Sequence, residues 1–186
     1  MCIRDSPNEE PIKVIKKMKQ TDNFKFDEAN VMNELVYRNL SEDAKRQICA
    51  WKYGGEYDLY NLPAYEEMQV RQIGFMNPQR GKNYYGFWDE SILVGFVNIL
   101  EEKEEVFIGI GVNPDLCNKH YGQRMLLITY EISKKLYPNK PLYLEVRTWN
   151  IRAIKCYQKA GFRIDGQAYE LTTGIGTGTF YRMIRE

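Results

Sequence analysis

The segment from Leu144 to Phe162 constrains the possible folds of this 186-residue chain more than any other. The run PLYLEV, which begins at Pro141, is short, apolar and rich in β-prone residues, so it predicts a buried strand. A helix should follow, because Asn150 suits an N-cap and Gly161 suits the end of a helix. The positions i+3, i+4 and i+7 from the cap hold Ala153, Ile154 and Tyr157, as an amphipathic helix requires.

A strand that leads into this helix would bring Glu145 and Tyr157 to one place. The carboxylate would leave the strand, and the phenol would lie along the next helix. A carboxylate and a phenol at one site are a plausible general base and general acid. The pattern therefore predicts proton-transfer chemistry.

Composition indicates a single globular domain of α/β or α+β type, with 44% apolar and 27% charged residues. The net charge is +1 and both signs are spread along the chain, so we do not expect nucleic acid as a partner. No signal peptide or long apolar span is evident, so we expect a cytoplasmic protein without membrane contact. We expect a monomer or a homodimer.

The cysteines and the single histidine argue against metal chemistry. Cys2, Cys49, Cys117 and Cys156 are too scattered for a CxxC metal site. His120 alone makes a histidine-based metal centre or a Ser-His-Asp triad hard to build. We therefore expect no metal.

Residues 1–30 are polar, lysine-rich and poorly periodic, so they predict an extension rather than part of the domain. The opening letters MCIRDS look like a cloning or sequencing remnant. We expect the working domain to span residues 31–186.

The rest of the chain predicts one strand, two helices, three strands, and then helix and strand in alternation with a last hairpin. Residues 54–63 should form a loop or turn. The long helix should bury one side that carries Met125, Ile128, Ile132 and Leu136. The expected strands are Leu35–Arg38, NYYGFW from Asn83, ILVGFVNIL from Ile92, Val106–Val112, Leu142–Val146, Ile164–Leu171 and Thr179–Ile184; the expected helices follow Ser41, cover Tyr65–Ile73 and Tyr121–Leu136, and follow Asn150.

The predicted strand and helix resemble motif B of the GNAT (GCN5-related N-acetyltransferase) superfamily, and the order of elements over Glu34–Glu186 resembles that fold. Members carry an Asn, an Ala, a Tyr and a terminal Gly-Phe, which here are Asn150, Ala153, Tyr157, Gly161 and Phe162. The resemblance implies an α/β (α+β) fold with a mixed, mostly antiparallel central sheet of six to seven strands flanked by about four helices. It also implies transfer of an acetyl group from acetyl-coenzyme A to a primary amine of a small molecule or peptide.

The cofactor site that the resemblance implies lies one strand and one helix upstream. A helix N-terminus favours anions such as a pyrophosphate. The superfamily pattern, Gln or Arg, two residues, Gly, one residue, then Gly or Ala, falls on Cys117, His120 and Gly122, and only Gly122 conforms. The expected cofactor contacts are Ile110, Gly111 and Val112 of the strand, Cys117, Asn118, Lys119, His120, Tyr121, Gly122 and Gln123 of the turn, and Asn150, Ala153 and Tyr157; Lys119 could equally be a solvated surface residue.

The catalytic roles follow from a closer resemblance to ribosomal-protein alanine acetyltransferases. An alkyl amine has a pKa of about 10, so a base must take its proton before attack at neutral pH. The resemblance implies that Glu145 is this base, acting through a water, and that Tyr157 protonates the departing sulfur. Bulk solvent, Glu101 or Glu105 could also take the proton.

The acceptor should bind near Ala50–Tyr65, which is dense in aromatic residues. Trp51, Tyr53, Glu56 and Tyr57 are the expected contacts, through charge and cation–π interaction. The same aromatic residues could instead pack a helix onto the sheet. Two other functions stay open at this point: a non-catalytic acyl-coenzyme A-binding or regulatory module, and an interaction domain whose motif is coincidental.

Overall fold

The computed structural model describes residues 35–186. The predicted extension 1–30 and the expected start of the domain at residue 31 lie outside this range. Within it, no helix is both long enough and apolar enough to cross a membrane.

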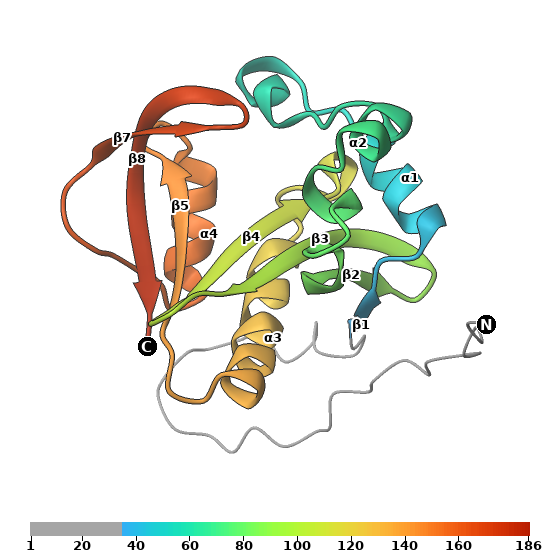
Figure 1. Cartoon of the computed structure of the whole chain (residues 1–186). Coiled ribbons are helices and arrows are strands. Elements are labelled where there is room, and N and C mark those ends of the chain that lie inside the picture. Colours follow the sequence, from blue (N-terminus) through green and yellow to red (C-terminus); the bar gives the residue numbers. More distant parts are fainter. Residues whose placement is uncertain (1–34) are drawn as a thin grey trace.

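The described chain forms one mixed sheet of eight strands with helices on both faces (Figure 1). Strands follow the order β1-β2-β3-β4-β5-β8-β6, and β7 also pairs with β8. The pairing is antiparallel throughout except between β4 and β5. The strands are β1 Val36–Asn39, β2 Tyr84–Asp89, β3 Ile92–Glu101, β4 Val106–Val112, β5 Leu142–Arg147, β6 Arg163–Ile164, β7 Tyr169–Thr173 and β8 Gly176–Arg185.

The sheet has one strand more than the six to seven expected, because the predicted strand Ile164–Leu171 is interrupted. Its two ends are β6 and β7, which pair with successive parts of β8. The chain turns between them at Gly166, whose φ of 81° is a conformation that suits glycine. The predicted final strand is also longer than expected, since β8 starts at Gly176.

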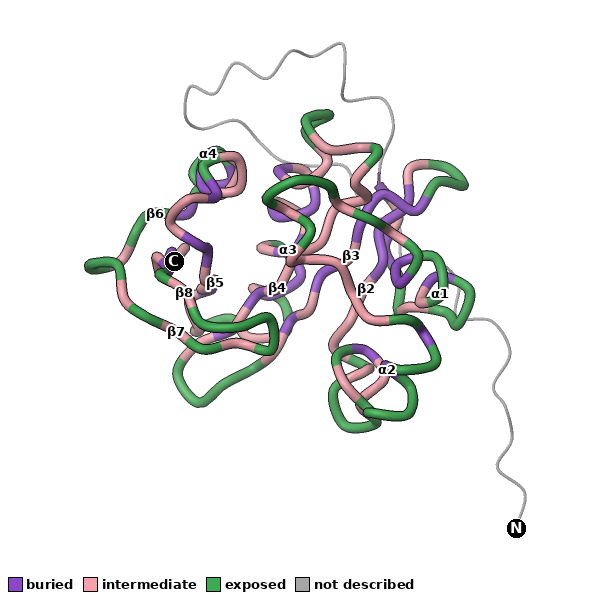
Figure 2. Tube along the Cα trace, turned by 90° about the horizontal axis from the view of Figure 1, so that it is seen from above, coloured by how far each residue is buried: buried purple, intermediate pink, exposed green. Residues whose placement is uncertain are grey.

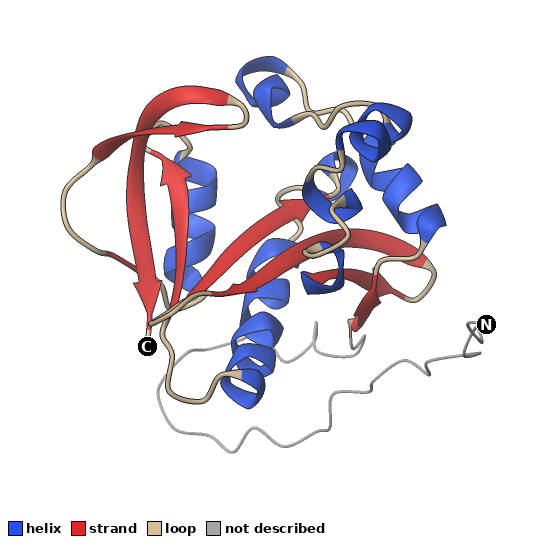
Figure 3. Ribbon diagram, in the orientation of Figure 1, coloured by secondary structure: helices blue, strands red, loops and turns tan. Residues whose placement is uncertain are grey.

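Four α-helices flank the sheet, as expected (Figure 3). They are α1 Glu42–Ala50, α2 Tyr65–Arg71, α3 Tyr121–Leu136 and α4 Ile151–Lys159. Both predicted N-caps are confirmed: Ser41 Oγ accepts from the Ala44 N–H at 3.2 Å, and Asn150 Oδ1 accepts from the Ala153 N–H at 3.1 Å. The predicted loop at 54–63 contains a short 3₁₀ helix, η2 Gly55–Tyr60; the others are η3 Gly74–Met76, η4 Gly81–Asn83 and η5 Pro114–Leu116.

The core has two parts, one on each face of the sheet. Buried residues follow the central strands and the sides of the helices that pack on them (Figure 2). The larger part packs α3 and α4 against the sheet and includes Met125, Leu126 and Ile132. The smaller part packs α1 and α2 against the other face. Leu136 was expected to be buried with Met125, but it is 51% exposed, because the last turn of α3 runs into solvent beside the exposed Lys135.

Leu126 and Leu136 give a matched test of this arrangement. Leu126 is fully buried on α3, so Leu126→Ala should lower the free energy of unfolding by about 2–5 kcal/mol. Leu136→Ala on the same helix should change it by about 0.5 kcal/mol or less, because little apolar surface is lost. Urea denaturation measures both values, and equal losses would contradict the packing described here.

Candidate active site

The sheet opens between its two central strands. β4 and β5 pair only at Val106 with Leu142 and at Phe107 with Tyr143, and beyond these residues the strands diverge (Figure 1). A cavity of about 620 Å³ lies at this divergence. It is lined by β4, β5, the turn before α3, one side of α4 and the segment that follows α1.

Most of the predicted site residues line this single cavity. From the cofactor set these are Ile110, Gly111, Val112, Cys117, Asn118, His120, Tyr121, Gly122, Gln123, Asn150, Ala153 and Tyr157, and from the others Glu145, Trp51 and Tyr53. Lys119, Glu56 and Tyr57 are not among its lining residues, so the structure does not bring them to the site. Lys119 and Glu56 are exposed, and the Tyr57 ring packs on Trp149 with a centroid distance of 5.6 Å.

The turn before α3 presents a row of main-chain N–H groups. Asn118 and His120 have φ values of 65° and 62°, in the left-handed region. That conformation favours glycine, which explains why the superfamily pattern has glycine where this chain has His120. The helix has no side-chain cap, and the N–H groups of residues 118–123 have no hydrogen-bond acceptor within the described part of the chain.

Gly122 also has a packing role. A Cβ atom at this position would lie 3.0 Å from the Cys156 Sγ, so the absence of a side chain lets the start of α3 approach α4 closely. On the next residue, the Gln123 side chain donates to the Lys159 carbonyl at 3.2 Å and joins the two helices again. The turn is therefore held in place by α4.

Tyr157 lies on the cavity side of α4 near two other tyrosines. Burial raises the pKa of the Tyr157 phenol, and the neighbouring Cys156, Tyr60 and Tyr53 raise it further. Burial also raises the pKa of Tyr53 to about 12. These hydroxyls therefore stay protonated at neutral pH and can donate hydrogen bonds.

Hydrogen bonds fix the tyrosines that surround Tyr157. The Tyr53 hydroxyl donates to the Val112 carbonyl at 2.6 Å and so ties the segment after α1 to the end of β4. Asn150, whose Oδ1 caps α4, donates from Nδ2 to the Tyr60 hydroxyl at 3.2 Å. Tyr53 and Tyr60 thus bridge the two sides of the cavity.

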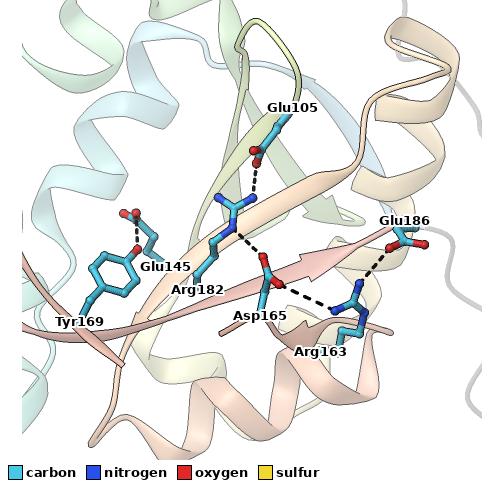
Figure 4. Close-up of polar contacts among 7 residues, drawn as sticks. All are labelled: Glu105, Glu145, Arg163, Asp165, Tyr169, Arg182 and Glu186. Atoms are coloured by element: carbon cyan, nitrogen blue, oxygen red, sulfur yellow. Dashed lines mark hydrogen bonds and ion pairs between the residues drawn. The ribbon is translucent and has the colours of Figure 1, made fainter. Parts of the chain in front are cut away.

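Glu145 reaches the cavity from β5 and accepts a hydrogen bond from the Tyr169 hydroxyl at 2.7 Å (Figure 4). The alternative carboxylates lie elsewhere. Glu105 forms an ion pair with Arg182, and Glu101 forms one with Lys140 at 2.6 Å. Neither is among the lining residues.

The two cysteines of the cavity are poor nucleophiles. Burial raises the pKa of Cys156 to about 11 and also raises that of Cys117. The reactive form of a cysteine is the thiolate, which is scarce at neutral pH for thiols with raised pKa values. These side chains therefore serve as packing at neutral pH.

Several lining residues were not predicted from the sequence, although the spacing of some of them could have indicated the site. Arg147 follows Glu145 by two residues on β5, so it lies on the same face of the strand. Arg152, Lys155 and Lys159 follow one another at helical spacing on α4, on the side that faces the turn. Tyr60, Phe96 and Phe180 come from three separate elements, and no local pattern connects them.

Comparisons with known proteins agree with this arrangement. The model of the acetyltransferase (GNAT) family matches residues 46–162. The search of curated proteins finds no match. Among solved structures, a GNAT-family acetyltransferase from Bacillus anthracis superposes with a TM-score of 0.68 at 18% identity, over 82% of this chain and 95% of that one.

Two further solved structures share the fold. A spermidine N-acetyltransferase from Vibrio cholerae, in complex with CoA and spermine, has a TM-score of 0.63 at 17% identity, over 81% of this chain and 94% of that one. An aminoglycoside acetyltransferase in complex with coenzyme A has a TM-score of 0.62 at 17% identity, over 82% and 94%. The expected mixed, mostly antiparallel sheet with flanking helices is confirmed. Because the family model covers more than half of the chain, including the turn and the strand and helix that line the cavity, this protein belongs to the acetyltransferase (GNAT) family, whose members use acetyl-coenzyme A.

Proposed function

We propose that this acetyltransferase moves the acetyl group of acetyl-coenzyme A to a primary amine by direct attack of the amine on the thioester. The observation that carries the proposal is that Glu145 and Tyr157, from two different elements, line one cavity beside a turn of unpaired N–H groups. The spermidine and aminoglycoside acetyltransferases of the same fold act on amines, which supports an amine acceptor. The raised thiol pKa values disfavour a covalent acyl-cysteine.

The residues at the turn fit coenzyme A. Six consecutive N–H groups without an internal acceptor, at the N-terminus of the 16-residue helix α3, suit a pyrophosphate. Arg152, Lys155 and Lys159 line the same region and add positive charge. Beyond Phe107 the edge of β4 has no partner strand on the β5 side, so Ile110 and Gly111 can offer main-chain groups to an extended pantetheine arm.

Two side chains of this protein carry out the proton transfers of the reaction. Glu145 takes a proton from the acceptor amine through a water, and Tyr157 gives its phenolic proton to the sulfur as the thiolate leaves. A main-chain N–H near Val112 donates a hydrogen bond to the carbonyl oxygen and stabilises the negative charge that develops there. This division of roles is the one implied by the resemblance to ribosomal-protein alanine acetyltransferases.

Ligand binding tests the cofactor site directly. Acetyl-coenzyme A should raise the melting temperature, because a ligand present at 100 times its Kd stabilises the folded state by about 2.7 kcal/mol. S-acetylpantetheine lacks the pyrophosphate, so at the same concentration it should raise the melting temperature much less. Equal shifts from both would contradict the turn as the phosphate site, and no shift from either would contradict the cofactor assignment.

Release of free coenzyme A thiol across a panel of primary amines tests the transfer itself. We expect thiol release that depends on both acetyl-coenzyme A and the amine, with the acetylated amine found by mass spectrometry. Binding of acetyl-coenzyme A without transfer to any amine in the panel would contradict the proposed function.

A further inference from the structure

Arg147 is a charged side chain in the interior of the cavity. It is only 8% exposed, and it lines the cavity two residues after Glu145 on the same strand. Its guanidinium carbon lies 4.9 Å from the centre of the Phe180 ring. Gly178 makes room for it, since a Cβ at that position would fall 1.9 Å from the Arg147 Nη1.

The positive charge of Arg147 has no counterion in the described chain. Its two terminal nitrogens donate to the carbonyls of Thr177 and Gly176, each at 3.3 Å, which is long for a hydrogen bond. Its Nε is buried without any acceptor. A buried charge that lacks an opposite charge destabilises the free protein, and an anion bound beside it would relieve that penalty.

Glu145 is the negatively charged counterpart of Arg147 on this strand, and it also lacks a partner of opposite charge in the part of the chain that the structure describes. It accepts a hydrogen bond from Tyr169 but has no cationic partner within 4 Å among residues 35–186. Arg182, its neighbour on β8, is paired instead with Glu105 and Asp165 (Figure 4). The strand therefore presents one carboxylate and one guanidinium on the same face, about 7 Å apart at their Cα atoms.

We propose that Arg147 binds a carboxylate of the acceptor, so that the substrate is an amine with a carboxylate close to its nitrogen, as in an amino acid. This inference rests on the proposed function, because it assigns the other end of the molecule that Glu145 deprotonates. The nitrogen and the carboxylate of an α-amino acid are separated by one carbon atom, which matches neighbouring cationic and anionic subsites on one strand face. Phe96, Phe107 and Phe180 line the same cavity and suit an apolar side chain.

The charges of the cavity argue against a polycation such as spermidine. Glu145 is the one carboxylate among the described lining residues, and Arg147, two positions further along the same strand, is positive. A polyamine has several ammonium groups and would need several carboxylates to bind them. The acceptor site of this chain therefore differs in charge from what a polyamine requires.

Matched amines with and without the carboxylate test the inference in the wild-type enzyme. L-Phenylalanine is compared with 2-phenylethylamine, L-leucine with 3-methylbutylamine, and both pairs with spermidine. Each kcat/KM is measured by thiol release at pH 7, where these amines are almost fully protonated, and is expressed per total amine. We expect the carboxylate to raise kcat/KM by about 10- to 100-fold, the range for a charge-assisted hydrogen bond.

Substitution of Arg147 assigns the preference to this residue. Arg147→Gln should abolish the preference for the carboxylate while 2-phenylethylamine keeps a measurable rate, and Arg147→Lys should restore part of it. Arg182→Gln removes a neighbouring arginine that does not line the cavity, so it should leave the ratio between the matched amines unchanged. The shift in melting temperature with acetyl-coenzyme A verifies that each variant is folded.

The outcomes separate this inference from the proposed function. A carboxylate preference that disappears in Arg147→Gln supports the inference. Equal rates within each pair, a preference for spermidine, or a preference that survives in Arg147→Gln overturns it and leaves amine acetylation standing. Absence of transfer to any amine, with acetyl-coenzyme A bound, overturns the proposed function and this inference with it.

Discussion

Tyr157→Phe should lower kcat by about 10²- to 10⁴-fold, because it removes the hydroxyl that protonates the departing sulfur. The Kd for acetyl-coenzyme A should change little, since the ring and its packing on α4 remain. The loss should appear in kcat and kcat/KM alike, as expected for an interaction made in the transition state. Steady-state kinetics together with a cofactor titration measure both quantities.

Tyr60→Phe is the matched control for this variant. It removes a hydroxyl of the same cavity that bonds only to Asn150 within the described chain, so we expect a loss of less than tenfold in kcat. A loss as large as that of Tyr157→Phe would mean that the tyrosine cluster acts as a unit. Full activity of Tyr157→Phe would refute the assignment of Tyr157 as the acid.

The raised pKa of Tyr157 also sets the direction of the pH dependence. An ordinary tyrosine begins to lose its proton near pH 10, and burial moves the pKa of Tyr157 above that value. The acid form therefore persists, while the acceptor amine becomes more reactive as it deprotonates. We expect kcat/KM to rise toward pH 10 without a descending limb, and a descending limb below pH 9 would indicate a different acid.

Local patterns predicted most of the fold because the signals coincide along the sequence. The cap at Asn150, the apolar spacing after it and Gly161 all indicate the same helix, and that helix is α4. The prediction of one strand over Ile164–Leu171 was wrong because the run contains Asp165-Gly166, a turn signal, and the chain turns at Gly166. The prediction that Leu136 is buried was wrong because periodicity indicates which face of a helix is apolar, but not how far the sheet extends along that face.

The candidate site could be predicted in part, for a similar reason. Residues on one element, such as Glu145 and Arg147, lie on the same face because of the periodicity of a strand. The sequence therefore predicts that they are close together. Tyr60 and Phe180 reach the cavity from distant elements, and only the tertiary structure brings them beside Tyr157 and Arg147. No local pattern indicates that Glu105 forms an ion pair with Arg182, which is 77 residues away.

Glu145→Gln should lower kcat/KM at pH 7 by about 10²- to 10⁴-fold, because the amide keeps the size of the side chain but cannot take a proton. The amide oxygen can still accept the hydrogen bond of Tyr169, so the local structure should persist. The deficit should shrink as the pH approaches the amine pKa of about 10, where the acceptor loses its proton without help. Rates measured from pH 6.5 to 10 follow this convergence.

Glu105→Gln is the matched control, since it removes a nearby carboxylate that is paired with Arg182 and does not line the cavity. We expect less than a tenfold change in its kcat/KM, with no dependence of that change on pH.

A Glu145→Gln enzyme that matches the wild type at pH 7 would show that solvent takes the proton. A larger loss in Glu105→Gln than in Glu145→Gln would move the base to Glu105. A deficit in Glu145→Gln that stays constant up to pH 10 would mean that the carboxylate binds the ammonium without deprotonating it. The convergence of the two rate profiles at high pH is therefore the feature that distinguishes a base from a binding group.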